Sequence, residues 1–182
     1  MGGSMSNYTI KLCDHTTQPN PSQGGIQSAL QGFFTRVFNG TSDSATVSWG
    51  TGSASDNVVV HFVPNRDPSS YIVQSWGKEK LASISEYAGG HTTMHHREIC
   101  SEIYQTVVLK PPHTGTKTLQ PLEQAKLAFH ECIHNVFPAW DEVDLNGHGG
   151  LGNTPVGADL SQWDIDTMRR GLSIHSVAKQ KL

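Results

Sequence analysis

The sequence predicts an α+β domain with a mixed, mostly four-stranded sheet, an active-site helix and a C-terminal helix. Three observations predict this fold. An amphipathic segment at 27–38 comes first, short β-rich runs follow between residues 45 and 109, and a helical period begins at Leu119. Because 182 residues suit one domain, we assign 7–182 to it and interpret 1–6 as a cloning remnant with the native start.

The first helix is predicted at 27–38, "QSALQGFFTRVF". Its apolar residues recur close to helical spacing: Ala29, Leu30, Phe33, Phe34 and Phe38. The preceding segment 14–25 is rich in residues that break both helical and strand periods, so we expect a loop there.

Strands are predicted where short runs of β-branched and aromatic residues are bounded by Gly, Pro, Asn and Asp. The runs are "ATVSW" at 45–49, "NVVVHFV" at 57–63, "LASISEY" at 81–87 and "IYQTVVL" at 103–109. We expect them to form a single sheet.

Two helices are predicted in the C-terminal half. The first follows Leu119, with Thr118 as its cap, Pro121 in its first turn and Pro138 at its end. The second is "DLSQWDIDTMRRGL", with Asp159 or Ser161 as N-cap and Gly171 near its end.

The composition restricts the choice of partner. A net charge of −3 without a Lys/Arg cluster gives no surface for nucleic acid or an anionic membrane, and no apolar run approaches the ~20 residues of a membrane span. We therefore expect a protein or peptide substrate, with the oligomeric state left open. A secreted protein or delivered effector is favoured over a cytoplasmic one. An odd number of cysteines is no disulfide framework, although a bridge between Cys13 and Cys100 stays open.

The segment "FHECIHN" contains His130, Glu131 and His134 in the pattern HExxH. On a helix, residues four apart lie above one another on the same face, so two imidazoles can bind one zinc ion. The glutamate between them can then act as a general base toward water on the metal. We predict a zinc site here, with the histidines on a polar face and the apolar residues packed against the sheet.

These residues resemble the zincin metallopeptidases, and the order of elements is similar to that of their metzincin branch. "NVVVHFV", "LASISEYAGG", "IYQTVVL" and "AKLAFHECIHN" follow one another as the zincin strands and active-site helix do, within residues 57–172. The resemblance implies a zincin-like fold, and an edge strand at Ser83–Gly89 that pairs with an extended substrate.

The sequence departs from the metzincin pattern after His134, because Phe137 and Trp140 stand where the glycine and the third ligand would be. His148, within "NGHGG", is our predicted third ligand, since three neutral imidazoles are a common catalytic zinc set and the glycines let the backbone bend. Its spacing is similar to that in SprT-like proteases. Asp141 is the alternative, either as a ligand or as a partner of a ligand imidazole; Glu142 and Asp144 are further candidates.

The predicted function is that of a zinc-dependent endopeptidase, with His130, His134 and His148 as metal ligands and Glu131 as general base. The alternative is a non-catalytic zinc-binding or accessory domain. The group that stabilises negative charge on the substrate is left open among Tyr87, Tyr104, His91 and His175. We interpret the other histidines of "GGHTTMHHREIC" as surface residues or residues at the rim of the cleft.

Overall fold

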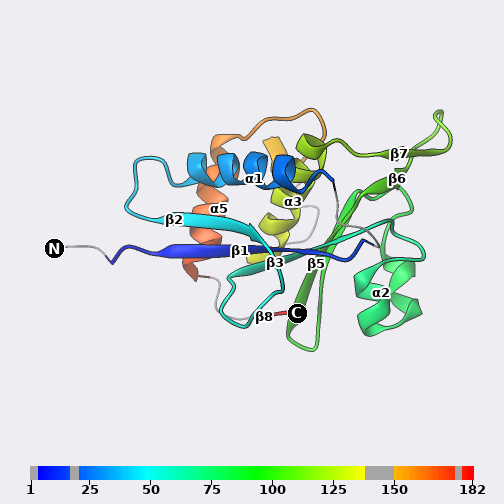
Figure 1. The fold of residues 1–182 in the computed structure, drawn as a ribbon, viewed down its shortest axis with the longest axis horizontal. Coiled ribbons are helices and arrows are strands. Elements are labelled where there is room, and N and C mark those ends of the chain that lie inside the picture. The colour runs from blue at the N-terminus through cyan, green and yellow to red at the C-terminus, as the bar shows by residue number, and fades with distance from the viewer. Residues whose placement is uncertain (1–3, 17–20, 138–149, 175–177) are drawn as a thin grey trace.

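The computed structural model describes residues 4–16, 21–137, 150–174 and 178–182. It is a mixed α/β fold whose sheet is mostly parallel (Figure 1). The strand order is β2 (Ser44–Trp49), β1 (Asn7–Asp14), β3 (Val58–Val63), β5 (Glu98–Tyr104) and β4 (Gly90–His95), and β8 (Lys179–Gln180) pairs with β5. Only β4 runs antiparallel to its neighbour among these pairs. A separate hairpin joins β6 (Thr106–Val108) to β7 (Thr116–Thr118).

Helices cover both faces of the sheet. On one face, α1 (Gln23–Val37), α3 (Pro121–Val136) and α5 (Gln162–Ile174) pack against one another and α1 and α3 also contact the sheet. On the other face lie α2 (Tyr71–Trp76) and the short 3-10 helix η1 (Lys78–Ser83); Figure 1 shows α2 well apart from α1.

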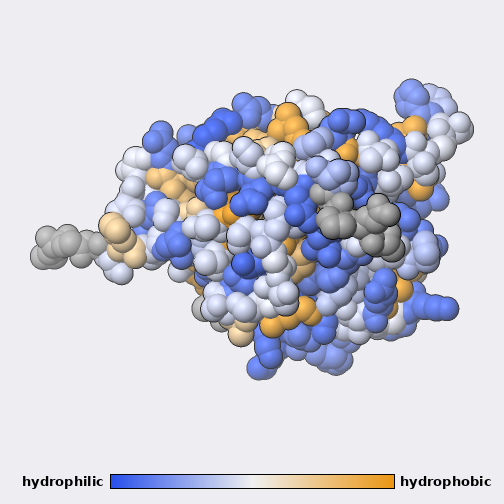
Figure 2. Space-filling model, viewed as in Figure 1, coloured by the Kyte–Doolittle hydropathy of each residue, from blue (hydrophilic) through white to orange (hydrophobic). Residues whose placement is uncertain are grey.

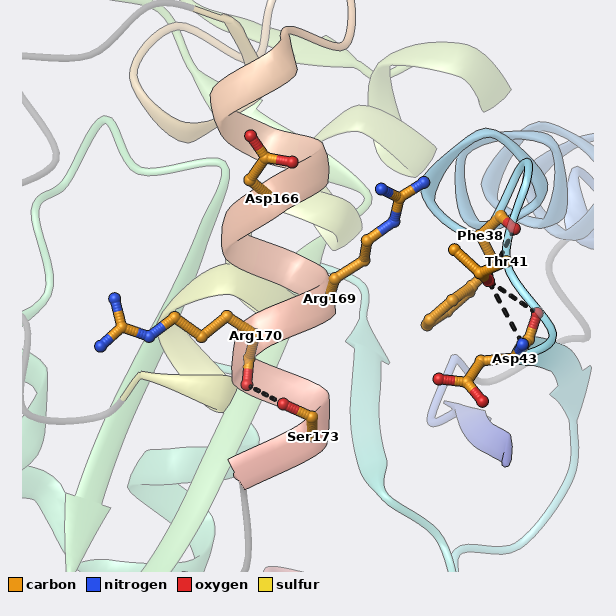
Figure 3. Close-up of a pocket in the computed structure, with 7 residues that line it drawn as sticks. All are labelled: Phe38, Thr41, Asp43, Asp166, Arg169, Arg170 and Ser173. Carbon is orange, nitrogen blue, oxygen red and sulfur yellow. Dashed lines mark hydrogen bonds between the residues drawn. The ribbon is translucent and has the colours of Figure 1, made fainter. Parts of the chain in front are cut away.

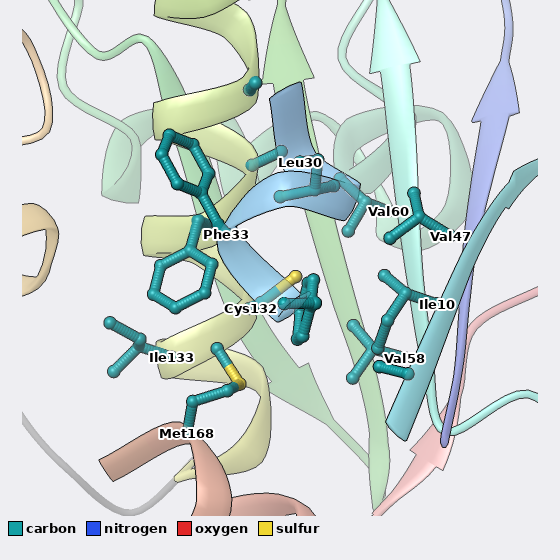
Figure 4. Packing of buried hydrophobic residues seen from close by; sticks show 14 of the residues in the cluster. Ile10, Leu30, Phe33, Val47, Val58, Val60, Cys132, Ile133 and Met168 are labelled. Carbon is teal, nitrogen blue, oxygen red and sulfur yellow. The ribbon is translucent and has the colours of Figure 1, made fainter. Parts of the chain in front are cut away.

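The main core lies between the sheet and the first group of helices. Every residue of β3 is buried, as is usual for a parallel strand covered on both faces. Its Val58 and Val60 point toward Phe33 of α1 and Cys132 of α3 (Figure 4). A smaller cluster on the opposite face joins β3 and β5 to Ile72 of α2. The sheet therefore holds α3 by its apolar side.

The strand predictions are confirmed in part. The runs at 45–49 and 57–63 form β2 and β3, whereas the run at 103–109 is divided between the end of β5 and β6. The strand predicted at 81–87 is wrong, because this segment contains the end of η1 and a turn. The guanidinium of Arg66 donates to the carbonyls of Leu81 and Ile84 at 2.9 and 3.0 Å, which satisfies backbone groups that a strand would have paired.

The sheet is larger than the predicted four strands, because β1, β4 and β8 lie in segments that were not predicted as strands. The helices are confirmed with shifted ends. The N-cap of α3 is Gln120, in a capping box with Glu123, while Thr118 belongs to β7. Helix α5 continues past Gly171 to Ile174.

The cysteines and the surface can also be compared with the sequence-based predictions. Cys13, Cys100 and Cys132 are free and buried, so the bridge left open by the sequence is not formed. Within the described ranges, no helix is long and apolar enough to cross a membrane. On the face shown in Figure 2, hydrophobic residues are scattered among hydrophilic ones.

Candidate functional site

Helix α3 brings His130 and His134 together, as the HExxH spacing predicts. Their Nε2 atoms are 3.1 Å apart and their rings meet edge to face, with centroids 4.7 Å apart at 70°. The helix around them is more enclosed than predicted. The histidines are half-buried and Glu131 is only 4% exposed, so the predicted polar face is largely enclosed by the fold.

The tautomer of His130 is fixed by a backbone contact. Its Nδ1 is 2.8 Å from the carbonyl oxygen of Leu151, and because a carbonyl only accepts, Nδ1 carries the proton. Neutral His130 therefore presents the lone pair of Nε2 toward His134. Ligand imidazoles in metalloproteins are usually held in this way.

The carbonyl that holds His130 is itself held in place. Leu151 belongs to η2 (Gly150–Gly152), and the buried carboxylate of Asp164 accepts from the backbone N–H groups of Leu151 and Gly152 at 3.0 and 2.7 Å. Gly150 has φ +76, a left-handed conformation that favours glycine. Helix α5 thus orients His130 through η2.

His134 is kept in its neutral form. Burial, then the neighbouring His130 and His91, lower the pKa of His134 to about 3. A neutral imidazole is the form that binds a metal ion. Without a metal, its Nε2–H can donate to the lone pair of His130, which accounts for the 3.1 Å contact equally well.

Glu131 lies beside the histidine pair and is held from the sheet. Its Oε1 is 4.0 Å from Nε2 of His130, and its Oε2 accepts a 2.6 Å hydrogen bond from the Thr92 hydroxyl of β4. Glycine makes this approach possible, because a Cβ on Gly90 would lie 3.1 Å from Cγ of Glu131 and 2.7 Å from the carbonyl oxygen of Glu102. Strand β4 therefore packs close to the proposed base.

The pair has the spacing of two ligands, but the described residues do not complete a site. Two nitrogens on one tetrahedral zinc ion at about 2.0–2.1 Å lie roughly 3.3–3.4 Å apart, close to the observed separation. However, no group of three or more His, Cys, Asp or Glu side chains in the described part of the chain is arranged to hold a metal ion. His148, and the alternatives Asp141, Glu142 and Asp144, lie outside the described residues.

The identification with the zincin metallopeptidases is wrong on these findings. The described residues contain no complete metal-binding group, and the architecture is a mixed α/β fold that is not specific to zincins. No family model matches the chain, and no curated protein or solved structure is significantly similar to it. The similarity to metzincins and SprT-like proteases thus reduces to the HExxH pattern.

The predicted substrate-binding strand and several candidate site residues lie elsewhere than the sequence predicted. The predicted substrate-pairing strand at Ser83–Gly89 does not form, and the edge strand beside α3 is β4. Tyr104 donates to Glu102 at 2.5 Å on the face that carries α2, so it does not face the histidine pair. His95 packs beside Trp76, near the tip of the β4–β5 hairpin. His175 lies outside the described residues.

No local pattern in the sequence links the residues that support the pair to the HExxH segment. Thr92 and Asp164 are 39 and 33 positions from Glu131 in the numbering. Thr92 belongs to no motif, and the capping box of Ser161 with Asp164 indicates a helix start but no contact with HExxH. Only the pairing of β4 with β5 and the packing of α5 bring them to the site. A polar residue in a predicted strand or helix is otherwise most often solvated.

A hollow lies between α5 and the loop after α1. It has a volume of about 440 Å³ and is lined by Phe38, Thr41, Asp43, Asp166, Arg169, Arg170 and Ser173 (Figure 3). Arg169 donates to the carbonyls of Val37 and, at 3.0 Å, Asn39. The guanidinium therefore caps the end of α1, and none of the HExxH residues lines this hollow.

Proposed function

We propose that the protein is a metal-dependent peptidase, with zinc as the ion and with His130 and His134 as two of its ligands. The observation that carries the proposal is the 3.1 Å separation of the two Nε2 atoms, with Nδ1 of His130 bonded to the carbonyl of Leu151. This arrangement leaves unprotonated nitrogen available in the orientation that a shared ion requires. His148 stays the predicted third ligand.

Glu131 is the proposed general base. A divalent ion, when bound, lowers the pKa of a coordinated water and polarises a substrate carbonyl. Glu131 is not a ligand in this proposal. His130 and His134, four residues apart, lie above one another on one side of the helix, and Glu131 lies one residue further round. Its carboxylate, 4.0 Å from Nε2 of His130, can accept a proton from water and return it to the leaving amine.

A peptide fits the site as substrate because β4 is the last strand of the sheet beside α3. An extended chain can add to such an edge through backbone hydrogen bonds. The polar, mildly acidic composition supports a protein substrate over nucleic acid. The natural substrate is not specified by these features.

A non-catalytic zinc-binding or accessory domain is the second candidate. It is favoured by the absence of a complete ligand set in the described part of the chain and by the direct contact that the two imidazoles make. Such a domain could bind metal but would not cut a peptide.

One experiment separates the two candidates. The purified protein is analysed for bound metal by mass spectrometry and then incubated with denatured casein, with and without a chelator. A peptidase would contain about one equivalent of zinc and show chelator-sensitive cleavage. Zinc without cleavage would favour the accessory domain, and a metal-free protein that stays metal-free after incubation with zinc would exclude both.

A further inference from the structure

A chain of hydrogen bonds connects Glu131 with the C-terminal strand. Thr92 Oγ1 is 2.6 Å from Glu131 Oε2 and 2.9 Å from Ser101 Oγ. Ser101 Oγ also accepts from Asn135 Nδ2 at 2.9 Å, and Asn135 exchanges hydrogen bonds of 2.8 and 3.0 Å with the amide of Gln180. These contacts link two strands and α3 to β8.

Three members of the chain are buried and the fourth, Thr92, is partly buried. Ser101 and Asn135 are fully buried, Gln180 is 6% exposed and Thr92 is half-buried. Buried polar groups are costly unless paired, so the chain has a stable arrangement only when each member keeps its partners.

The Glu131 carboxylate, at one end of the chain, only accepts hydrogen bonds and so determines where the Thr92 proton lies. A threonine hydroxyl has one proton, and the 2.6 Å contact with the carboxylate oxygen is the shortest of the three that Thr92 makes with Glu131 and Ser101. The Thr92 hydroxyl therefore donates to Glu131, and Ser101 Oγ lies 2.9 Å away from it. Asn135 Nδ2 donates both to Ser101 Oγ and to Gln180 Oε1, so Asn135 joins the two ends of the chain.

The C-terminal strand is fixed firmly enough to anchor the chain. The backbone N–H of Val59 donates to Gln180 Oε1 at 3.0 Å, and Lys181 N–H donates to the carbonyl of Ile99 at 2.8 Å. Nε2 of His61 lies 2.8 Å from the Lys181 carbonyl. Gln180 thus joins the central strand β3 to α3.

We propose that Thr92, Ser101, Asn135 and Gln180 are positioning residues that hold the Glu131 carboxylate in one orientation. The inference rests on the proposed function only for its kinetic consequence, since the orientation itself is a structural property. Thr92 contacts the Glu131 carboxylate directly, and the other three act through Thr92. Their role is to keep the proposed base beside the histidine pair.

The decisive substitution is Thr92→Val, which removes the hydroxyl and preserves the shape of the side chain. Thr92→Ser retains the hydroxyl and should rescue the effect. Thr93→Val is the matched control, because Thr93 is the next residue of the same strand and faces the other side of the sheet. Gln180→Met tests the far end of the chain.

Two measurements are made on each variant. In crystal structures, Thr92→Val should displace Glu131 Oε2 while wild type, Thr92→Ser and Thr93→Val keep it in place. In casein-peptide hydrolysis, Thr92→Val should lower kcat by about 10–100-fold with KM and zinc content unchanged, the usual range for a residue that orients an active group. Gln180→Met should lower kcat by a smaller factor, about 2–30-fold.

The outcomes distinguish this inference from the proposed function. If Thr92→Val leaves Glu131 in place, or if it leaves the kcat of an active enzyme unchanged, the positioning role is overturned. If wild-type protein binds zinc but cleaves nothing, the proposed peptidase is overturned, and the crystal structures alone decide whether Thr92 orients Glu131.

Discussion

At the scale of single residues, the surroundings of the two ring nitrogens that meet matter most. Burial keeps the pKa of His134 low, and the Leu151 carbonyl fixes the proton of His130 on Nδ1. Burial thus disfavours positive charge on His134, and the contact with Leu151 turns Nε2 of His130 toward it. The spacing four residues apart supplies the pair, while the surroundings set its protonation.

The first prediction concerns the proposed base. Glu131→Gln should keep zinc bound, because Glu131 is not a proposed ligand, and should lower hydrolysis by about 10²–10⁴-fold, the usual contribution of a general base. Metal analysis and casein cleavage check the two parts. Glu86→Gln, an exposed substitution of the same type, serves as control. Full activity in Glu131→Gln would remove Glu131 from the mechanism.

A second prediction concerns Asp164, which accepts from backbone N–H groups of η2 and from Ser161. Asp164→Asn replaces one acceptor by an amide that cannot accept, so we expect the free energy of unfolding to fall by about 1–3 kcal/mol. Zinc affinity should fall about 10–100-fold because the Leu151 carbonyl loses its support. Urea unfolding and zinc titration measure both.

Asp166→Asn is the matched control for that prediction, since Asp166 lies on the same helix and is exposed. It should change neither quantity appreciably. Equal zinc affinity in wild type and Asp164→Asn would mean that η2 does not orient His130.

At the scale of elements, α3 is placed by close contacts on two sides. Gly89 and Gly90 let β4 approach it, since a Cβ on Gly89 would lie 2.6 Å from Cδ1 of Leu127. On the other side, a Cβ on Gly171 of α5 would lie 2.3 Å from Cγ2 of Val136. Small residues at both contacts let the neighbouring elements approach α3 closely.

The third prediction tests the contact between α3 and α5. Gly171→Ala should lower the free energy of unfolding by about 1–3 kcal/mol, because the added methyl overlaps Val136. Gly32→Ala in α1, where nothing lies within 4 Å of the added Cβ, should instead raise it by about 0.4–1 kcal/mol. Urea denaturation compares the two. A stabilising Gly171→Ala would show that the helices can separate at little cost.

At the scale of the whole molecule, the C-terminal segment is joined to the centre of the sheet. His61 of β3 is 1% exposed, and its Nδ1 shares a 2.7 Å hydrogen bond with Nε2 of His15. Its ring stacks on Tyr71, and its Nε2 contacts the Lys181 carbonyl. Tyr71 in turn donates to the carbonyl oxygen of Leu182 at 2.7 Å. The last residues therefore belong to the folded structure.

The fourth prediction is a pH dependence of stability. Burial lowers the pKa of His61 from 6.5 to about 4, and the neighbouring His15 acts in the same direction. The unfolded chain then binds a proton between these values that the folded chain does not, so stability decreases as the pH falls from 6.5 toward 4. The contribution of His61 is at most about 3 kcal/mol.

The measurement is urea unfolding of wild type and His61→Gln between pH 4.5 and 7. The variant should be less stable at pH 7 but should lose less stability on acidification, because its side chain does not titrate. The difference between the two proteins separates His61, together with its hydrogen-bonded neighbour His15, from His134, whose pKa is lowered in both. Parallel pH profiles would contradict the prediction.

The sequence by itself determined the elements whose pattern is local. The helical period of α3, the buried run of β3 and the spacing of His130, Glu131 and His134 all follow from residues close together in the chain. Strand β4 and the 3-10 turn at 78–83 did not follow, since pairing with β5 and the contacts of Arg66 decided them. Periodicity carries no information about such distant partners.

Only the tertiary structure decided what surrounds the histidine pair. Thr92 holds Glu131, Asp164 holds the carbonyl that orients His130, and Gln180 reaches Asn135 from the C-terminal strand. The family resemblance failed for the same reason, because a four-residue spacing on a helix brings two imidazoles together without specifying the fold or the other ligand. Local geometry fixed the pair, and long-range packing fixed its environment.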